Sequence, residues 1–241
     1  MKYYISQASL FLVPFFLFTE EKKGTTERIV FMKISEKELL RLNELSKIDR
    51  TYWDQPGVIL AGMDEVGRGP LAGPVVVGCV VMPPEPLLPY VNDSKKLSEK
   101  RREALYEQIL ATSLAHSTAW VGPEVIDEIN ILEATKRGFA EAFSKIGVPV
   151  TDVLIDALRG LDIPARQHPL IHGDALTYSI GAASILAKVA RDRYMVEQDA
   201  LYPQYGFARN KGYGTAEHIA ALREYGPCPI HRRSFIGHFV P

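Results

Sequence analysis

The sequence is poor in cysteine and carries almost no net charge. Its 241 residues include two cysteines, Cys79 in the apolar run from Val75 to Met82 and Cys228 between two prolines. Neither has a neighbour at metal-ligand spacing. Two cysteines in a chain of this length and globular composition exclude a disulfide scaffold and indicate a reducing compartment, the cytoplasm. Lysine and arginine number 28 against 29 aspartates and glutamates, a net charge of −1. A neutral total does not exclude a nucleic-acid binder, because acidic metal ligands can offset a basic face.

The sequence also lacks internal repeats, low-complexity tracts and a run long enough to span a membrane. The apolar stretch from Ala8 to Phe18 is too short for a bilayer and contains Pro14. Neither a Walker-type Lys-Ser/Thr nor a dinucleotide-binding fingerprint occurs, which argues against a phosphate-binding metabolic enzyme. With 46% hydrophobic residues the chain can bury a full core. We expect a monomer without membrane association.

The N-terminal 31 residues differ in character from the rest. Their apolar run resembles the middle of a secretory signal, but the polar segment 19–24 follows where a small-x-small cleavage site should stand. We therefore expect residues 1–31 to be a disordered or non-native extension, with Met32 as the natural start. Ser35 and Glu38 form a capping-box pattern before leucines at helical spacing, which predicts an amphipathic helix over 36–48. Residues 32–56 are thus expected to be a helical extension of a main domain over 57–241.

The main domain shows an α/β pattern. Valine-rich and other short apolar runs predict strands over 58–65, 75–82, 114–121, 153–156 and 170–174. The first two are joined by a tight Gly/Pro-rich connection, which favours a hairpin. Capping residues and helical spacing predict helices over 98–110, 123–129, 132–146, 178–201 and 215–225. This order predicts a mixed five-stranded sheet with helices on its faces and a helical C-terminal region.

Three of the predicted strands end in acidic residues: Asp64 with Glu65, Asp156 and Asp174. A single acid after a strand is usually a turn residue. Acids at three matching places are a different matter, because converging carboxylates raise one another's pKa unless a positive partner is present. Carboxylate oxygens select Mg²⁺ or Mn²⁺, and a pair of such ions suits an in-line phosphoryl displacement. The pattern therefore indicates a metal-dependent enzyme of phosphoryl transfer.

Around these acids the sequence resembles the type 2 ribonucleases H, specifically the ribonuclease HII family. The resemblance runs over about residues 58–238. It is carried by the segments 64–74 (DEVGRGPLAGP), 92–98 (NDSKKLS), 155–156, 173–174, 182–193 (AASILAKVARDR), 211–215 (KGYGT) and 231–235 (HRRSF), with His218. The fourth acid is Asp174, whereas the related ribonuclease HIII usually has Glu there and a larger N-terminal domain. As an ordered set these motifs are highly specific, and they leave residues 1–31 outside the match.

The resemblance implies a ribonuclease H-like fold and an endonuclease. Its substrates would be the RNA strand of RNA–DNA hybrids and single ribonucleotides embedded in duplex DNA, cut on their 5′ side, in DNA replication and repair. Two Mn²⁺ or Mg²⁺ ions would be bound by Asp64, Glu65, Asp156 and Asp174, with Asp64 bridging them. Hydrolysis by an activated water would leave 5′-phosphate and 3′-hydroxyl ends.

The same resemblance implies the substrate-binding residues. The backbone of Gly67, Arg68 and Gly69 would read the ribose 2′-hydroxyl, which distinguishes RNA from DNA. Tyr213 would stack on the sugar of the next deoxynucleotide. Lys95 and Lys96, placed before a capped helix, would hold phosphates. For each motif alone a plain turn or a solvated surface remains the alternative interpretation.

Other basic and histidine residues carry weaker signals. Lys188, Arg191 and Arg193 share the helix over 178–201, so some of them must lie on its solvent face. A zinc site at His168 and His172 is disfavoured by Pro169 between them, and His218 and His231 are expected to form hydrogen bonds or contact phosphate.

Two competing functions remain open at this point. A junction resolvase with the same sheet would share the acids but lack the Gly67–Gly69 motif with Tyr213. A binding module on an inactive nuclease fold would have lost a carboxylate, and none is lost.

Removal of residues 1–31 is expected to leave folding and cleavage unchanged, because no capping or turn pattern connects their apolar run to the main domain. A chain that starts at Met32 should match the full chain in circular dichroism, melting temperature and cleavage rate. Insolubility or inactivity of the shortened chain would show that the segment belongs to the core or the site.

Overall fold

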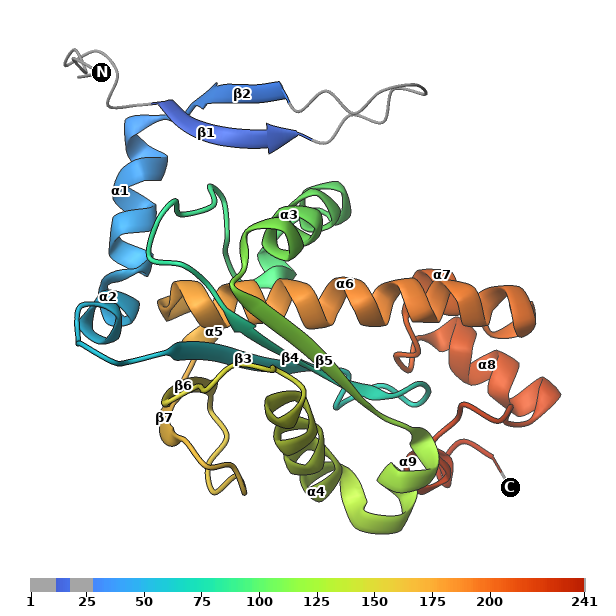
Figure 1. The fold of residues 1–241 in the computed structure, drawn as a ribbon. Coiled ribbons are helices and arrows are strands. Elements are labelled where there is room, and N and C mark those ends of the chain that lie inside the picture. Colours follow the sequence, from blue (N-terminus) through green and yellow to red (C-terminus); the bar gives the residue numbers. More distant parts are fainter. Residues whose placement is uncertain (1–11, 18–27, 241) are drawn as a thin grey trace, which may run out of the picture.

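The computed structural model describes residues 12–17 and 28–240, and its centre is a mixed five-stranded sheet (Figure 1). The strand order is β5-β4-β3-β6-β7. Strands β3, β4 and β5 are antiparallel, whereas β6 and β7 run parallel to β3. Their bounds are Leu60–Val66, Val75–Val81, Ala115–Val121, Asp152–Asp156 and Arg166–Leu170 for β3 to β7. The predicted fold class and the β3–β4 hairpin are confirmed.

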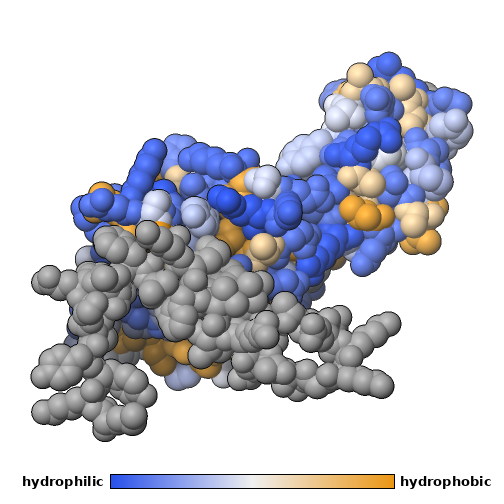
Figure 2. Space-filling view, turned by 90° about the horizontal axis from the view of Figure 1, so that it is seen from above, coloured by the Kyte–Doolittle hydropathy of each residue, from blue (hydrophilic) through white to orange (hydrophobic). Residues whose placement is uncertain are grey.

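Helices cover both faces of this sheet. Figure 1 shows α6 (Tyr178–Leu201) and α3 (Glu99–Thr112) on one face and α4 (Pro123–Ser144) on the other. The remaining helices are α1 Glu36–Leu45, α2 Lys47–Trp53, η2 Ser94–Lys96, α5 Gly173–Leu176, η3 Pro203–Tyr205, α7 Phe207–Asn210, α8 Ala216–Tyr225 and α9 Arg233–Ile236. No helix in the described part of the chain is long and apolar enough to cross a membrane. Viewed from above, the surface outside the grey residues is mostly hydrophilic (Figure 2).

Several predicted elements differ in detail. The expected strand over 170–174 is wrong: β7 ends at Leu170, His172 has a φ of 59°, and Gly173 already begins α5. The helix over 36–48 is interrupted at Ser46, which separates α1 from α2. The capping box is half formed, because the Ser35 hydroxyl accepts from the Glu38 amide while the Glu38 carboxylate binds other partners.

The split of α4 into two helices was predicted and has a local cause. Asn130 has a φ of 68°, and its side-chain oxygen accepts from the amides of Leu132 and Glu133. It therefore caps the second half of α4 from within the chain.

Part of the N-terminal extension forms a hairpin. Strands β1 (Leu12–Leu17) and β2 (Arg28–Lys33) pair antiparallel. The expectation of disorder for residues 1–11 and 18–27 lies outside the described residues. The β1–β2 pairing adds regular structure where none was expected, and Met32 falls within β2. The domain boundaries and the dispensability of residues 1–31 stay predictions.

Helix α6 lies against the sheet at backbone distance. A Cβ at Gly62 of β3 would come within 2.2 Å of the Ser179 carbonyl carbon, and one at Gly78 of β4 within 2.5 Å of the Ala183 oxygen. Small residues at the start of α6 permit this approach, as the sequence predicts. Any side chain at Gly62 or Gly78 would therefore push the helix away from the strands.

The α1–α2 segment is fastened to the main domain by buried carboxylates. Asp49 of α2 is fully buried and accepts from the amides of Tyr178 and Ser179, both at 2.9 Å. It caps the N-terminus of α6 from a distant part of the sequence, and a carboxylate there complements the helix dipole. Glu38 similarly accepts from the Tyr90 amide at 2.6 Å. Residues 36–53 are therefore part of the packed structure.

Asp49→Ala is expected to destabilise the protein, because two buried amides at the start of α6 lose their acceptor. Each buried amide without a partner costs about 1–3 kcal/mol. Urea denaturation followed by circular dichroism measures the loss, and Asp54→Ala, at the exposed end of the same helix, is the matched control. Equal midpoints for the two variants would contradict the capping role.

Candidate active site

Two of the four predicted carboxylates come from neighbouring parallel strands. Met63 of β3 is paired with Ile155 of β6, so the residues that follow, Asp64 and Asp156, lie side by side. Side chains alternate along a strand, and Asp64 shares its face with Gly62, which lies against α6. Leu154, two residues before Asp156, packs on the same side against Ile180 of α6. Both carboxylates therefore emerge on the α6 side of the sheet.

The other two carboxylates arrive by different routes. Asp174 is buried in the first turn of α5, and the preceding Gly173 amide donates to Asp156 Oδ1 at 2.7 Å. Asp174 therefore reaches the site from a short helix. The sequence analysis had placed it at the end of a strand, and that placement is wrong. Glu65 lies one residue after Asp64, with Oε1 3.5 Å from Arg68 Nη1.

The carboxylates raise one another's pKa. Burial raises the pKa of Asp64 well above its usual range, and the charges of Glu65, Asp156 and Asp174 add to the effect. Burial likewise raises the pKa of Glu65, with Arg68 opposing and Asp156 reinforcing the shift. The pKa of Asp174 is raised by burial and by Asp93 and Asp156. The cluster therefore holds more negative charge than its surroundings neutralise.

Lys95 is a second predicted cation beside this cluster, in addition to Arg68. Its Nζ lies 3.7 Å from Asp174 Oδ2. Burial opposes its charge, but Asp174 and Asp64 raise the pKa of Lys95 overall. Lys96 instead pairs with Asp93, at 3.9 Å. The structure thus brings Lys95, but not Lys96, to the acids.

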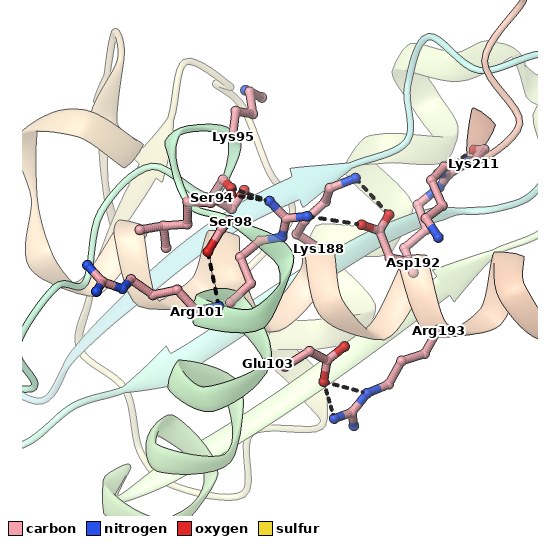
Figure 3. A network of polar contacts seen from close by, with 12 residues as sticks. Ser94, Lys95, Ser98, Arg101, Glu103, Lys188, Asp192, Arg193 and Lys211 are labelled. Atoms are coloured by element: carbon pink, nitrogen blue, oxygen red, sulfur yellow. Dashed lines mark hydrogen bonds and ion pairs between the residues drawn. The ribbon is translucent and has the colours of Figure 1, made fainter. Parts of the chain in front are cut away.

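A polar network holds the turn that carries Lys95. Arg102 of α3 donates to the carbonyls of Ser94 and Leu97 and lies 3.8 Å from Asp192 of α6. Asp192 in turn accepts from Lys188 at 2.7 Å. Figure 3 shows Lys188 and Asp192 on one side of the network, Ser94 on the other, and the Lys95 side chain pointing away from it. The basic residues of α6 therefore divide: Lys188 supports this turn, and Arg193 pairs with Glu103 and Glu107.

The donor set suits a hard divalent cation. Within the residues that the structure describes, no group of three or more Asp, Glu, His or Cys side chains has the arrangement of a formed metal site. However, Glu65 Oε2 is buried without a hydrogen-bond partner there, and the neighbouring carboxylates still raise the pKa of Asp64. Four carboxylates with an unsatisfied buried oxygen fit Mg²⁺ or Mn²⁺.

The predicted recognition motif lies between the acids and Tyr213. Gly67 has a φ of +93°, and a Cβ there would come within 2.3 Å of Arg191 Nε, so glycine is required. A Cβ at Gly69 would lie 4.0 Å from Cε1 of Tyr213, and the residue Tyr213 is 44% exposed. Arg68 reaches back to Glu65. The loop and the tyrosine, 144 residues apart in the sequence, thus form one surface next to the carboxylates.

Two buried arginines were not assigned a role from the sequence. Arg191 donates to the carbonyls of Ala72, Pro74 and Lys211, and Arg232 donates to those of Gly67, Arg68 and Gly73. Both are fully buried. A sequence signal existed for Arg191, which shares a helix face with Ala187 and Met195, because a charged residue on an apolar face must be buried with polar partners.

His218 and His231 form hydrogen bonds, which is one of the two roles expected for them. His218 Nε2 lies 3.0 Å from His231 Nε2, and His218 Nδ1 lies 2.9 Å from the Tyr213 carbonyl. Burial lowers the pKa of both, that of His231 to about 4. His168 instead lies 2.9 Å from Asp152 Oδ1.

Comparison with known proteins matches the part of the chain that contains this site. The family model described as Ribonuclease HII matches residues 61–238. A ribonuclease HII of Caldanaerobacter subterraneus subsp. tengcongensis is 48% identical over 201 residues, which is 83% of each chain. The crystal structure of ribonuclease H2 from Pyrococcus horikoshii OT3 superposes with a TM-score of 0.63 at 27% identity, over 73% of this chain and 92% of that one. A Bst-RNase HIII solved in complex with Mn²⁺ shares the fold, with a TM-score of 0.57 at 17% identity over 84% of this chain and 71% of that chain.

Asp64→Asn is expected to raise stability in metal-free buffer. Folding raises the pKa of Asp64. The free energy of unfolding therefore decreases as the pH rises from the pKa of Asp64 in the unfolded chain to its higher pKa in the folded protein. At neutral pH the amide removes this repulsion and keeps an oxygen for the Glu65 amide. The melting temperature should rise by about 2–4 °C per kcal/mol of repulsion relieved.

Added Mg²⁺ or Mn²⁺ should then stabilise the wild type more than Asp64→Asn, since binding to the folded state shifts the equilibrium. Asp162→Asn, which removes an exposed carboxylate, is the control for net charge. A lower metal-free melting temperature for Asp64→Asn than for this control would contradict the repulsion argument.

Proposed function

The chain belongs to the ribonuclease HII family and is a ribonuclease H; from this premise we propose that it cuts duplex DNA on the 5′ side of a single embedded ribonucleotide, as well as the RNA strand of RNA–DNA hybrids. The expected products are 5′-phosphate and 3′-hydroxyl ends. We also propose that it acts as a monomer in the cytoplasm, in ribonucleotide removal during DNA replication and repair.

One observation carries this proposal: the carboxylate cluster and the Gly67–Gly69 loop share one surface with Tyr213. Arg68 connects them, because its guanidinium lies 3.5 Å from Glu65 while its neighbour Gly69 lies beside the Tyr213 ring. A surface that recognises one ribose and a site that hydrolyses the adjacent phosphodiester must lie this close. A junction resolvase has no need of such a pairing.

The carboxylates supply the metal ligands in this proposal. Asp64, Glu65, Asp156 and Asp174 would hold two Mn²⁺ or Mg²⁺ ions. Such ions lower the pKa of a bound water and stabilise the negative charge of the leaving oxygen. Lys95, close to Asp174, is placed to attract a phosphate once the acids are neutralised. Lys96, with 60% of its side chain exposed, is assigned to phosphates farther along the backbone.

Substrate recognition is assigned to the neighbouring loop and tyrosine. Arg68 and Gly69 are exposed, so their backbone groups can approach a sugar closely. The exposed face of Tyr213 suits stacking on the sugar of the following deoxynucleotide, where a 2′-hydroxyl would collide with the ring. The site then requires a ribonucleotide on the 5′ side of the Tyr213 position and prefers a deoxynucleotide at that position.

Tyr213→Ala is expected to reduce kcat/KM on a single-ribonucleotide duplex by about 5- to 150-fold, since an aromatic stacking contact contributes about 1–3 kcal/mol. An all-RNA/DNA hybrid should be affected less. The measurement is a gel assay with a 5′-labelled strand, and Tyr213→Phe, which keeps the ring, is the matched control.

Equal losses on both substrates would assign Tyr213 to general binding or to the fold. An all-DNA duplex should not be cleaved. Cleavage on the 3′ side of the ribonucleotide, or a 2′,3′-cyclic phosphate product, would overturn the hydrolytic proposal itself.

A further inference from the structure

Arg232 is a buried cation without an acidic partner at ion-pair distance. Its side chain has no exposed surface, and no ion pair of the described residues includes it. Its three hydrogen bonds all go to carbonyl oxygens: Nη2 to Gly67 at 2.5 Å, Nη1 to Arg68 at 2.8 Å and Nε to Gly73 at 2.9 Å. A desolvated guanidinium is costly. Because the guanidinium needs these carbonyls as acceptors, it restricts the conformation of the loop that carries them.

The orientation of the carbonyls fixes the orientation of the following amides. In a trans peptide the C=O of one residue and the N–H of the next point in opposite directions. The two peptides that follow Gly67 and Arg68 are trans. Because both carbonyls point inward to Arg232, the amides of Arg68 and Gly69 point outward.

These two amides are available to a ligand. Gly67 is buried, whereas Arg68 and Gly69 are exposed. Within residues 28–240, neither amide donates to another protein group. Pro70 follows and has no N–H. The loop thus presents two adjacent donors, with a positive charge behind them and the Tyr213 ring beside Gly69.

We propose that Arg232 is a positioning residue for ribose recognition: it holds the Gly67 and Arg68 carbonyls from the interior and so aims the Arg68 and Gly69 amides at the 2′-hydroxyl oxygen. The inference rests on the proposed function. Two adjacent amides also suit a phosphate oxygen, which shares the acceptor chemistry. A phosphate is present in all-DNA duplex, however, and a 2′-hydroxyl is not, so the two acceptors can be told apart.

Arg191 of α6 provides a matched control, because its side chain holds the same loop. It is equally buried and also makes three hydrogen bonds to carbonyls, but those belong to Ala72, Pro74 and Lys211. It holds the far end of the loop and the Lys211 carbonyl and packs beside Gly67, but it makes no hydrogen bond to the Gly67 or Arg68 carbonyl. Lysine at either position keeps the positive charge but cannot make three hydrogen bonds in the fixed geometry of a guanidinium.

The test compares Arg232→Lys with Arg191→Lys by binding. Dissociation constants are measured in EDTA for a duplex with one ribonucleotide and for the same all-DNA duplex. Arg232→Lys should reduce the preference for the ribonucleotide by about tenfold for each hydrogen bond lost, equivalent to about 1.4 kcal/mol. Arg191→Lys should weaken both duplexes alike and keep the wild-type preference. An unchanged preference in folded Arg232→Lys, or equal reductions in the two variants, would overturn the proposal.

A measurement on the wild type keeps the inference testable if Arg232→Lys fails to fold. Residue-resolved amide exchange should be fast at Arg68 and Gly69 in the free protein and slow in the complex with the ribonucleotide duplex. All-DNA duplex should give little protection. Equal protection by both duplexes would assign the amides to phosphate and overturn the proposal. A wild type that binds both duplexes equally would refute the proposed substrate specificity, and this inference with it.

Discussion

The close contact between α6 and strands β3 and β4 is the constraint on which the rest of the structure depends. It exists because Gly62 and Gly78 have no side chains where the backbone of the helix passes. Once α6 is placed, Asp49 caps its beginning, Asp192 near its middle holds the turn that carries Lys95, and Arg191 holds the loop after β3. One helix thus fixes the positions of the α1–α2 segment, the turn that carries Lys95 and the loop after β3.

The carboxylate cluster is held together against its own repulsion. Asp64 and Asp156 are fixed by strand register, and the Gly173 amide ties the loop before Asp174 to Asp156. Hydrophobic packing below the strands, from residues such as Ile155 and Phe139, supplies the stability that the charges reduce. A site of this kind is preorganised for a cation, because the cost of gathering the acids is met during folding and not during binding.

How much could be predicted from the sequence depends on whether a feature is local. The strands β3 and β4, the caps of α3 and α8 and the start of α6 follow from patterns within a few residues, and all were predicted. Asp174 was placed on a strand end because an apolar run precedes it, whereas the chain turns at His172 and starts a helix. The roles of Asp49 and Arg232 could not be predicted, because their partners lie 129 and 165 residues away and nothing near them in the sequence identifies those partners.

The hydrogen bonds between Arg232 and the loop after β3 also affect the order in which the site can form during synthesis. All four carboxylates have been added to the growing chain once Asp174 is made, but the side chain that holds the Gly67 and Arg68 carbonyls follows 58 residues later. A nascent or prematurely terminated chain therefore contains every proposed acidic ligand before it contains the group that orients the proposed recognition loop. During synthesis on the ribosome, the hydrogen bonds from Arg232 to the loop can form only after residue 232 has emerged.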